Sequence, residues 1–336
     1  MSDQALRSNM FITWYRQLGT SSKKALLSGS ALIIMFIIFS ILKPNLFLAK
    51  NNLINISQQI VTYLIIGCGL TFCLVCGGTD LSAGSSLGLS GIIVASLLIA
   101  GVPIYVAIPL AILFGLFMGI VNGFCIEVLG VFPFIATLGT QWIFRYIGNV
   151  IIDGKPIYTM EIPSKAVQEM FYLIGGGRTE AGIPYSVFIA AFYALIMGFV
   201  LAKTRVGRQI YACGSNLEAA KLSGINAVRT RMFAYCISGL SAAICGIIVT
   251  SRITSAQPMA GQGVELEAIA AAVVGGVSIS GGEGGIINTV IGALIMGVLR
   301  NGLNLNGVSS FWQFVIIGTI LVGACAVEAH RNKASK

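Results

Sequence analysis

The chain has 336 residues, of which 56% are hydrophobic and only 10% are charged, and its formal net charge is +9. Soluble globular domains carry about 25% charged residues. With so few polar residues and a mean hydropathy of +0.89, the chain cannot cover a water-facing surface and is predicted to be a polytopic membrane protein. The positive charge is typical of loops beside anionic lipid, and the lack of interleaved basic and aromatic residues disfavours nucleic-acid binding.

Ten segments are candidate membrane spans, since each span needs about 20 largely apolar residues. In chain order they cover residues 25–43, 53–76, 81–101, 103–124, 131–152, 185–202, 231–250, 266–281, 285–300 and 310–328. They predict an all-α transmembrane domain over 25–328. The segments between 266 and 300 are short and flank Ser-Gly-Gly-Glu-Gly-Gly, so they are either full spans or broken, re-entrant helices. Counts of eight or nine spans stay open.

Lys and Arg gather in the N-terminal tail 1–24, the segment 203–230 and the C-terminal tail 329–336. Basic residues favour cytoplasmic loops, so both termini and the central segment are predicted to be cytoplasmic. Six spans separate the first two regions and four separate the last two, which fits this assignment. The loops 153–184 and 252–265 then face the other side, either as partner-binding surfaces or as simple connections.

The second and third segments are separated by Gly-Gly-Thr-Asp-Leu-Ser-Ala-Gly, in which Asp80 is the only charge between Lys50 and Glu127. A carboxylate before a helix can accept hydrogen bonds from the first backbone N–H groups, here those of Ser82 or Ala83. Asp80 is therefore interpreted as a helix cap, with a gate or pathway contact as the alternative.

Polar and aromatic side chains inside the predicted spans are candidates for a transport pathway. Buried polar groups in lipid usually face a cavity or another helix, so ordinary helix–helix hydrogen bonding is the alternative for each. Gln58 and Gln59 are among the polar residues inside the predicted spans. The pathway candidates are Asn122, Phe134, Thr137, Gln141 and Asn149.

Charged residues in or beside the fifth and eighth segments need partners. Arg145 falls inside the fifth segment, where an unpaired charge is costly, so it is expected to reach outward or to pair with a carboxylate such as Asp153. Glu265 and Glu267 begin the eighth segment and are expected either to stabilise its helix N-terminus or to face a partner protein.

No catalytic or metal centre is predicted. Cys73 and Cys76 form a C-x-x-C pattern, but they lie in an apolar run without polar neighbours, which is typical of small hydrophobic residues in a membrane helix. The single histidine, His330, lies in the basic C-terminal segment. The chain contains no cluster of His, Asp and Glu and no phosphate-binding loop, so it is not expected to be an enzyme or to bind a cofactor.

The polar segment 204–232 is predicted to contain a short cytoplasmic helix. Asn216 is a suitable N-cap, Glu218 falls in the first turn, and Gly224 would end the helix. Ala219 and Ala220 are expected to form a face of small side chains that can enter a groove on another protein.

This helix carries Glu-Ala-Ala-Lys-Leu-Ser-Gly, which resembles the E-A-A-x-x-x-G signature of permease subunits in bacterial ATP-binding-cassette (ABC) importers. GGTDLSAG, FPFIATLGT, TRVGRQIYACGSNLEAAKLSGIN and GVELEAIAAAVVGGVSISGGEGG are similar to segments in the permeases of ribose, galactose and xylose importers. The resemblance covers nearly the whole chain, and it points to ribose first.

The resemblance implies the many-helix (type II) fold of vitamin B12 importers, with about ten spans, in the bacterial plasma (inner) membrane. A periplasmic or lipid-anchored binding protein would deliver the sugar, and a second permease subunit, identical or homologous, would complete the pathway. A separate tandem ATPase would use ATP. By the same resemblance, the residues that dock the ATPase are Gly214, Asn216, Glu218, Ala219, Ala220 and Gly224.

The alternative function is a secondary sugar transporter coupled to an ion gradient. Such transporters commonly need acidic residues within the membrane, and Asp80 is almost the only deep candidate. A secondary transporter also has no need of an ATPase-docking helix.

Overall fold

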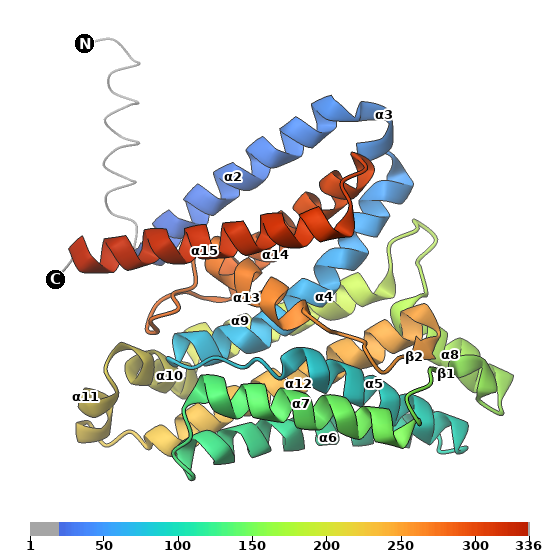
Figure 1. The fold of residues 1–336 in the computed structure, drawn as a ribbon, viewed down its shortest axis with the longest axis horizontal. Coiled ribbons are helices and arrows are strands. Elements are labelled where there is room, and N and C mark those ends of the chain that lie inside the picture. Colours follow the sequence, from blue (N-terminus) through green and yellow to red (C-terminus); the bar gives the residue numbers. More distant parts are fainter. Residues whose placement is uncertain (1–19, 335–336) are drawn as a thin grey trace.

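The computed structural model describes residues 20–334, and in this range the chain is almost entirely helical (Figure 1). The long helices and the half-length α13 are α2 (Thr20–Leu42), α4 (Lys50–Val75), α5 (Ala83–Ile99), α6 (Ile104–Glu127), α7 (Pro133–Ile151), α9 (Tyr185–Lys203), α12 (Ala227–Ile253), α13 (Val264–Gly275), α14 (Ile286–Leu305) and α15 (Ser310–Ala334). The short elements are α3 (Pro44–Phe47), β1 (Ile157–Tyr158), η1 (Thr159–Glu161), α8 (Lys165–Gly175), α10 (Arg205–Ser215), α11 (Leu217–Leu222) and β2 (Ser255–Ala256).

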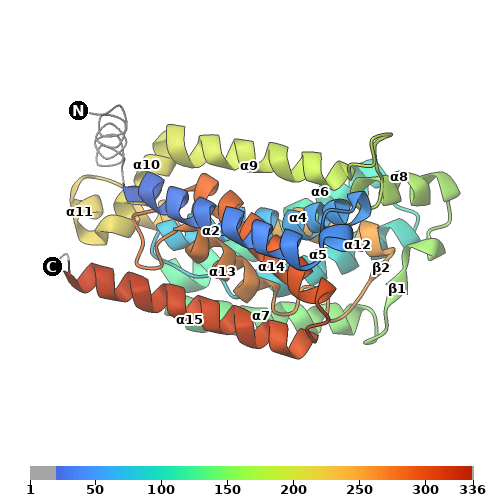
Figure 2. The ribbon, with the colours of Figure 1, turned by 90° about the horizontal axis from the view of Figure 1, so that it is seen from above.

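Each of the ten predicted segments coincides with one of the ten helices in the first group. Within the described range, six of them, namely α2, α4, α6, α9, α12 and α14, are long and apolar enough to cross a membrane. Figure 2 shows α9 and α15 on opposite sides of the molecule, and both carry exposed apolar side chains such as Phe192 and Phe311. An apolar outer surface of this kind suits contact with lipid, so the polytopic membrane class is confirmed.

Elements that are far apart in sequence gather at the two ends of the molecule. The start of α2, the end of α15, and both α10 and α11 lie at one end, whereas α8, β1 and β2 lie at the other (Figures 1 and 2). This arrangement agrees with the prediction that the two tails and the segment 203–230 share one side of the membrane. The side on which each end lies stays a prediction from the distribution of Lys and Arg.

The two loops at the far end form one docked unit. β1 from the loop 153–184 pairs antiparallel with β2 from the loop 252–265, with Ile157 opposite Ala256. The Ser251 hydroxyl accepts a hydrogen bond of 2.9 Å from the Gly175 amide and donates one of 2.5 Å to the Phe171 carbonyl. These bonds fix α8 against the end of α12, so the loops are ordered against the helix bundle.

Helix α13 is too short to cross a membrane by itself. Its 12 residues span about 18 Å at 1.5 Å per residue, whereas the hydrocarbon core is about 30 Å thick. The helix ends at Gly276, whose φ of +111° is in the left-handed region. The chain then continues as the irregular segment 276–285 before α14 begins. This geometry matches the broken-helix alternative.

Helices α6 and α12 cross with their backbones in close contact. A Cβ atom added to Gly119 would lie well inside van der Waals distance of the Tyr235 carbonyl oxygen, and one added to Gly239 would meet the Gly115 carbonyl oxygen. Small residues at a helix crossing allow such an approach in membranes, where dispersion contacts contribute much of the packing energy.

Gly119→Leu is expected to force α6 and α12 apart and to lower the stability of the purified protein, since overpacking a tight core costs about 1–3 kcal/mol or more. The melting temperature in detergent measures the effect. Gly139→Leu is the matched control, because a Cβ at Gly139 on α7 meets no atom within 4 Å. Equal melting temperatures for the two variants would contradict the close packing of α6 and α12.

Candidate functional site

The short helix α11 has the start and end that the sequence predicted. The Asn216 Oδ1 atom accepts a hydrogen bond of 3.0 Å from the Ala219 amide, which confirms the N-cap. After the helix, Gly224 has a φ of +79°, and the Ile225 amide donates a hydrogen bond of 3.1 Å to the Ala220 carbonyl. A left-handed glycine followed by this backbone bond is a common helix ending. The local sequence therefore specifies α11 at both ends.

The two alanines of α11 do not form one exposed face, and that expectation is wrong. Successive residues of an α-helix point about 100° apart, so Ala219 is exposed whereas Ala220 is 4% exposed and packs against the helix bundle. Glu218 pairs with Lys221 within the same helix at 2.9 Å. Leu222, which the sequence reasoning missed, is 90% exposed. The sequence does indicate that Leu222 is unusual, because it places an apolar side chain in a short helix of a polar segment.

Gly214 is half-buried, and the side on which a Cβ atom would project faces the helix bundle. A Cβ atom there would collide with the Val75 carbonyl at the end of α4 and with the Gly282 amide. The Gly282 amide itself donates a hydrogen bond of 2.8 Å to the Val75 carbonyl. On α10, the Tyr211 hydroxyl donates to the Gly284 carbonyl at 2.6 Å, and burial raises the pKa of its phenol above the usual value, so it remains a donor. Helix α10 thus contacts the irregular segment after α13.

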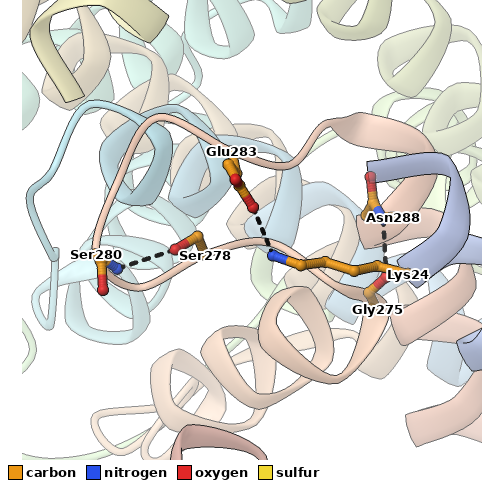
Figure 3. A network of polar contacts seen from close by, with 6 residues as sticks. All are labelled: Lys24, Gly275, Ser278, Ser280, Glu283 and Asn288. Carbon is orange, nitrogen blue, oxygen red and sulfur yellow. Dashed lines mark hydrogen bonds and ion pairs between the residues drawn. The ribbon is translucent and has the colours of Figure 1, made fainter. Parts of the chain in front are cut away.

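The segment 276–285 is also attached to α2, and the end of α13 just before it is attached to α14 (Figure 3). The Lys24 Nζ atom forms an ion pair of 2.8 Å with Glu283, and the Asn288 side-chain amide donates a hydrogen bond of 2.9 Å to the Gly275 carbonyl. The segment thus bonds to α2, α4 and α10, and it begins directly after the half-helix α13.

Asp80 is fully enclosed and joins three helices. Its Oδ1 atom accepts hydrogen bonds from the Ser82 amide at 2.9 Å, from the Ser82 hydroxyl at 2.7 Å and from the Asn122 side-chain amide at 3.3 Å. Its Oδ2 atom accepts a bond of 2.6 Å from the Ser238 hydroxyl. The predicted bond to the Ser82 amide is present, but Ser82 is the N-cap of α5, so Asp80 lies two residues before the cap position and is not itself the cap. The carboxylate therefore ties the start of α5 to α6 and α12.

Three of the five pathway candidates have separate local environments. Asn122 belongs to the Asp80 cluster and also accepts a hydrogen bond of 2.6 Å from the Thr140 hydroxyl. Thr137 is buried and donates to the Pro133 carbonyl of its own helix. Phe134 lies 49% exposed on the outside of α7. The bonds of Asn122 and Thr137 join or lie within helices, and a role of these three residues in the pathway stays a prediction.

The other two candidates, Gln141 and Asn149, lie further along α7. The Gln141 side-chain amide donates a hydrogen bond of 3.0 Å to Glu265 on α13. The Asn149 side-chain amide donates to the Arg145 carbonyl at 2.9 Å. The five candidates thus do not converge on one cavity.

Arg145 points into the protein, so the expectation that it reaches outward is wrong. It forms no ion pair with Asp153 or another carboxylate among residues 20–334, although Glu265 on α13 interacts electrostatically with its guanidinium. Its side chain donates to the Ala260 carbonyl in the loop before α13, and the residue is 8% exposed. Asp153 is exposed after the end of α7. The Ala260 carbonyl, in the loop between α12 and α13, accepts this hydrogen bond and stabilises the guanidinium inside the protein.

Glu265 and Glu267 are buried within the chain, at 4% and 3% exposure, so neither lies on a surface that a partner could contact directly. Glu267 forms an ion pair of 2.6 Å with Arg300 on α14, and the same guanidinium donates to the Tyr63 hydroxyl at 2.9 Å. These bonds join α13 to α14 and α4. Their place in the first turn of α13 agrees with the helix-terminus alternative.

The chain matches a known protein family over most of its length. Residues 52–325 match the family described as branched-chain amino acid transport system / permease component. The chain is 42% identical to the ribose import permease protein of Haemophilus influenzae over 298 residues, which is 89% of this chain and 91% of the relative. It is 38% identical to the D-allose transport system permease protein of Escherichia coli (88% and 89% covered) and 36% identical to the L-arabinose transport system permease protein of the same organism (90% of each).

No solved structure matches the chain. The family match and the full-length similarity to import permeases agree with the helical membrane architecture and with the E-A-A-x-x-x-G helix. The chain therefore belongs to the branched-chain amino acid transport system / permease component family and is a permease subunit of an ABC importer.

Proposed function

We propose that this chain forms the membrane pathway for a monosaccharide, with ribose as the preferred substrate. The observation that carries the proposal is the 42% identity to a ribose import permease across about nine-tenths of both chains. The allose and arabinose permeases are less similar, at 38% and 36%. These relatives are all permeases for monosaccharides, which supports a sugar over a branched-chain amino acid, and the greater identity to the ribose permease supports ribose.

The partners follow from the two ends of the molecule. A separate tandem ATPase, which uses ATP, docks against the exposed surface of α11. An extracytoplasmic sugar-binding protein docks at the end formed by α8, β1 and β2, whose strands pair across two loops. A second permease subunit, identical or homologous, completes the pathway. Both termini are cytoplasmic, and the protein lies in the bacterial inner membrane with about ten spans in the vitamin B12 importer-like (type II) arrangement.

Within this proposal, the segment 276–285 links the ATPase-docking helix to the half-helix α13. The support comes from its contacts: Gly282 bonds to Val75 at the end of α4, Tyr211 of α10 bonds to Gly284, and Glu283 pairs with Lys24. An arrangement in which α13 moves with this segment would open and close the cytoplasmic side of the pathway.

Radiolabelled uptake tests the substrate. In cells that lack their own ribose permease but retain a matching binding protein and ATPase, this chain is expected to restore ribose uptake. Unlabelled ribose should compete best, allose and arabinose less well, and leucine not at all. Uptake of leucine in place of ribose would overturn the assignment of the substrate class.

A further inference from the structure

A polar cavity of about 520 Å³ lies between the first turns of α4 and the last turns of α12 and α14. These turns are at the end of the molecule away from α10 and α11 (Figure 1). The volume is within the range of about 300–1,000 Å³ that is usual for small-molecule sites. The cavity is separate from the Asp80 cluster and from the five pathway candidates on α6 and α7.

The lining of this cavity consists mainly of carboxamides. Asn55, Gln58 and Gln59 come from α4 and Asn304 from α14, while Leu305 is the one hydrophobic side chain in the lining. Each carboxamide offers both N–H donors and a carbonyl acceptor. Neighbouring hydroxyl groups of a sugar likewise donate and accept, so the lining complements a neutral, hydroxyl-rich molecule.

Two further groups show that the cavity has unused hydrogen-bonding capacity. The Gln59 Oε1 atom is buried and has no hydrogen-bond partner in the structure, and an unsatisfied buried oxygen costs about 1–3 kcal/mol. Arg252, at the end of α12, donates at 3.3 Å to the Gln58 carbonyl but forms no ion pair within residues 20–334. No carboxylate lines the cavity, so a cationic ligand is disfavoured.

The cavity wall is held in place by its own amides. Asn52 and Asn301 exchange two side-chain hydrogen bonds of 3.0 Å and 2.8 Å, and Asn52 also donates to the Phe47 carbonyl at 2.9 Å. Both asparagines are buried, at 8% and 5% exposure. The paired amides fix α4 to α14, and the remaining carboxamides are left to face the cavity.

We propose that this cavity is an outer sugar-binding subsite, in which the carboxamides of α4 and α14 and the guanidinium of Arg252 bind the hydroxyl groups of a neutral monosaccharide. The proposal rests on the proposed function, since it names where the sugar first contacts this chain. Hydrogen bonds from carboxamides alone provide weak, rapidly reversible binding, which suits a site that must release its ligand inward.

Thiol protection tests the subsite without requiring transport. Asn55→Cys in membranes is labelled with a membrane-impermeant maleimide in the presence of ribose at millimolar concentrations. Ribose is expected to slow the labelling several-fold. Asn51→Cys is the matched control, because Asn51 is exposed one turn earlier on α4 and does not line the cavity. The unsubstituted chain gives the background from the native cysteines.

The outcomes separate this inference from the proposed function. The subsite is supported if ribose protects Asn55→Cys from labelling and if this protection is lost in the double variant Asn55→Cys, Gln59→Leu. Absence of protection in a chain that still transports ribose overturns the subsite and leaves the proposed function intact. Protection by ribose 5-phosphate but not by ribose would identify an anion site at Arg252 and would also overturn it. If transport of ribose fails while another neutral sugar protects, the substrate assignment fails and the subsite stands.

Discussion

Ala219→Arg is expected to abolish ATP-driven uptake while the protein remains folded and inserted in the membrane. Ala219 is exposed on α11, so a long charged side chain fits the isolated chain without disturbing its core. The same side chain would prevent close docking of another protein on this helix, and an interface with an unpaired charge at its centre loses several kcal/mol. Uptake in cells and copurification of the ATPase with this chain measure the effect.

Ala202→Arg is the control for this variant, because Ala202 is exposed at the same end of the molecule, in the last turn of α9. It should transport normally. Gly224→Asp should resemble Ala219→Arg, since the φ of +79° at Gly224 disfavours residues with a side chain and sets the end of α11. Normal uptake and normal ATPase copurification in Ala219→Arg would exclude α11 as the docking surface.

Asp80→Leu is expected to cause the largest loss of stability among single substitutions outside the helix crossings. Asp80 is 1% exposed and accepts four hydrogen bonds, from Ser82 (amide and hydroxyl), Asn122 and Ser238. Leucine would leave these buried donors without an acceptor, at about 1–3 kcal/mol for each group that finds no new partner. The yield of monodisperse protein and its melting temperature should both fall sharply.

Asp80→Asn separates a structural role from a gating role. The asparagine carbonyl can replace Oδ1, and its NH₂ group can donate to the Ser238 hydroxyl, so the stability of this variant should stay close to that of the unsubstituted chain. Glu161→Leu, which removes an exposed acid from the loop 153–184, is the control for loss of a carboxylate. Asp80→Asn with full stability but no transport would assign the carboxylate to the pathway instead.

The positions of the helices could be predicted from the sequence because hydropathy along the chain reports on withdrawal from water, whether into lipid or into the helix bundle, as for α4 and α12. The same is true of α11, whose Asn216 cap and Gly224 ending depend only on neighbouring residues. For residues 266–281 the sequence leaves two alternatives, a full membrane span or a broken, re-entrant helix. The structure ends α13 at Gly276, and hydropathy does not distinguish a helix from an extended segment packed inside the protein.

The site residues were predicted less well because their roles depend on contacts between distant segments. Hydropathy indicated that Arg145 lies in a span, but its partner, the Ala260 carbonyl, is more than a hundred residues away in sequence. The cavity between α4, α12 and α14 was missed for the same reason. Gln58 and Gln59 are visible in the sequence as polar residues within a span, whereas Asn304 and Arg252 lie at helix ends, where polar residues are common.

The central claim is that this chain is the permease of an ATP-driven sugar importer. Measuring which energy source drives ribose uptake tests this claim most directly. Proteoliposomes would contain this chain with its copurified ATPase, and the ribose-loaded binding protein would be added outside. We predict that ribose accumulates only when ATP is sealed inside, and that an ionophore has no effect. Uptake that continues without ATP and collapses with the ionophore would contradict the account and would identify an ion-coupled secondary transporter.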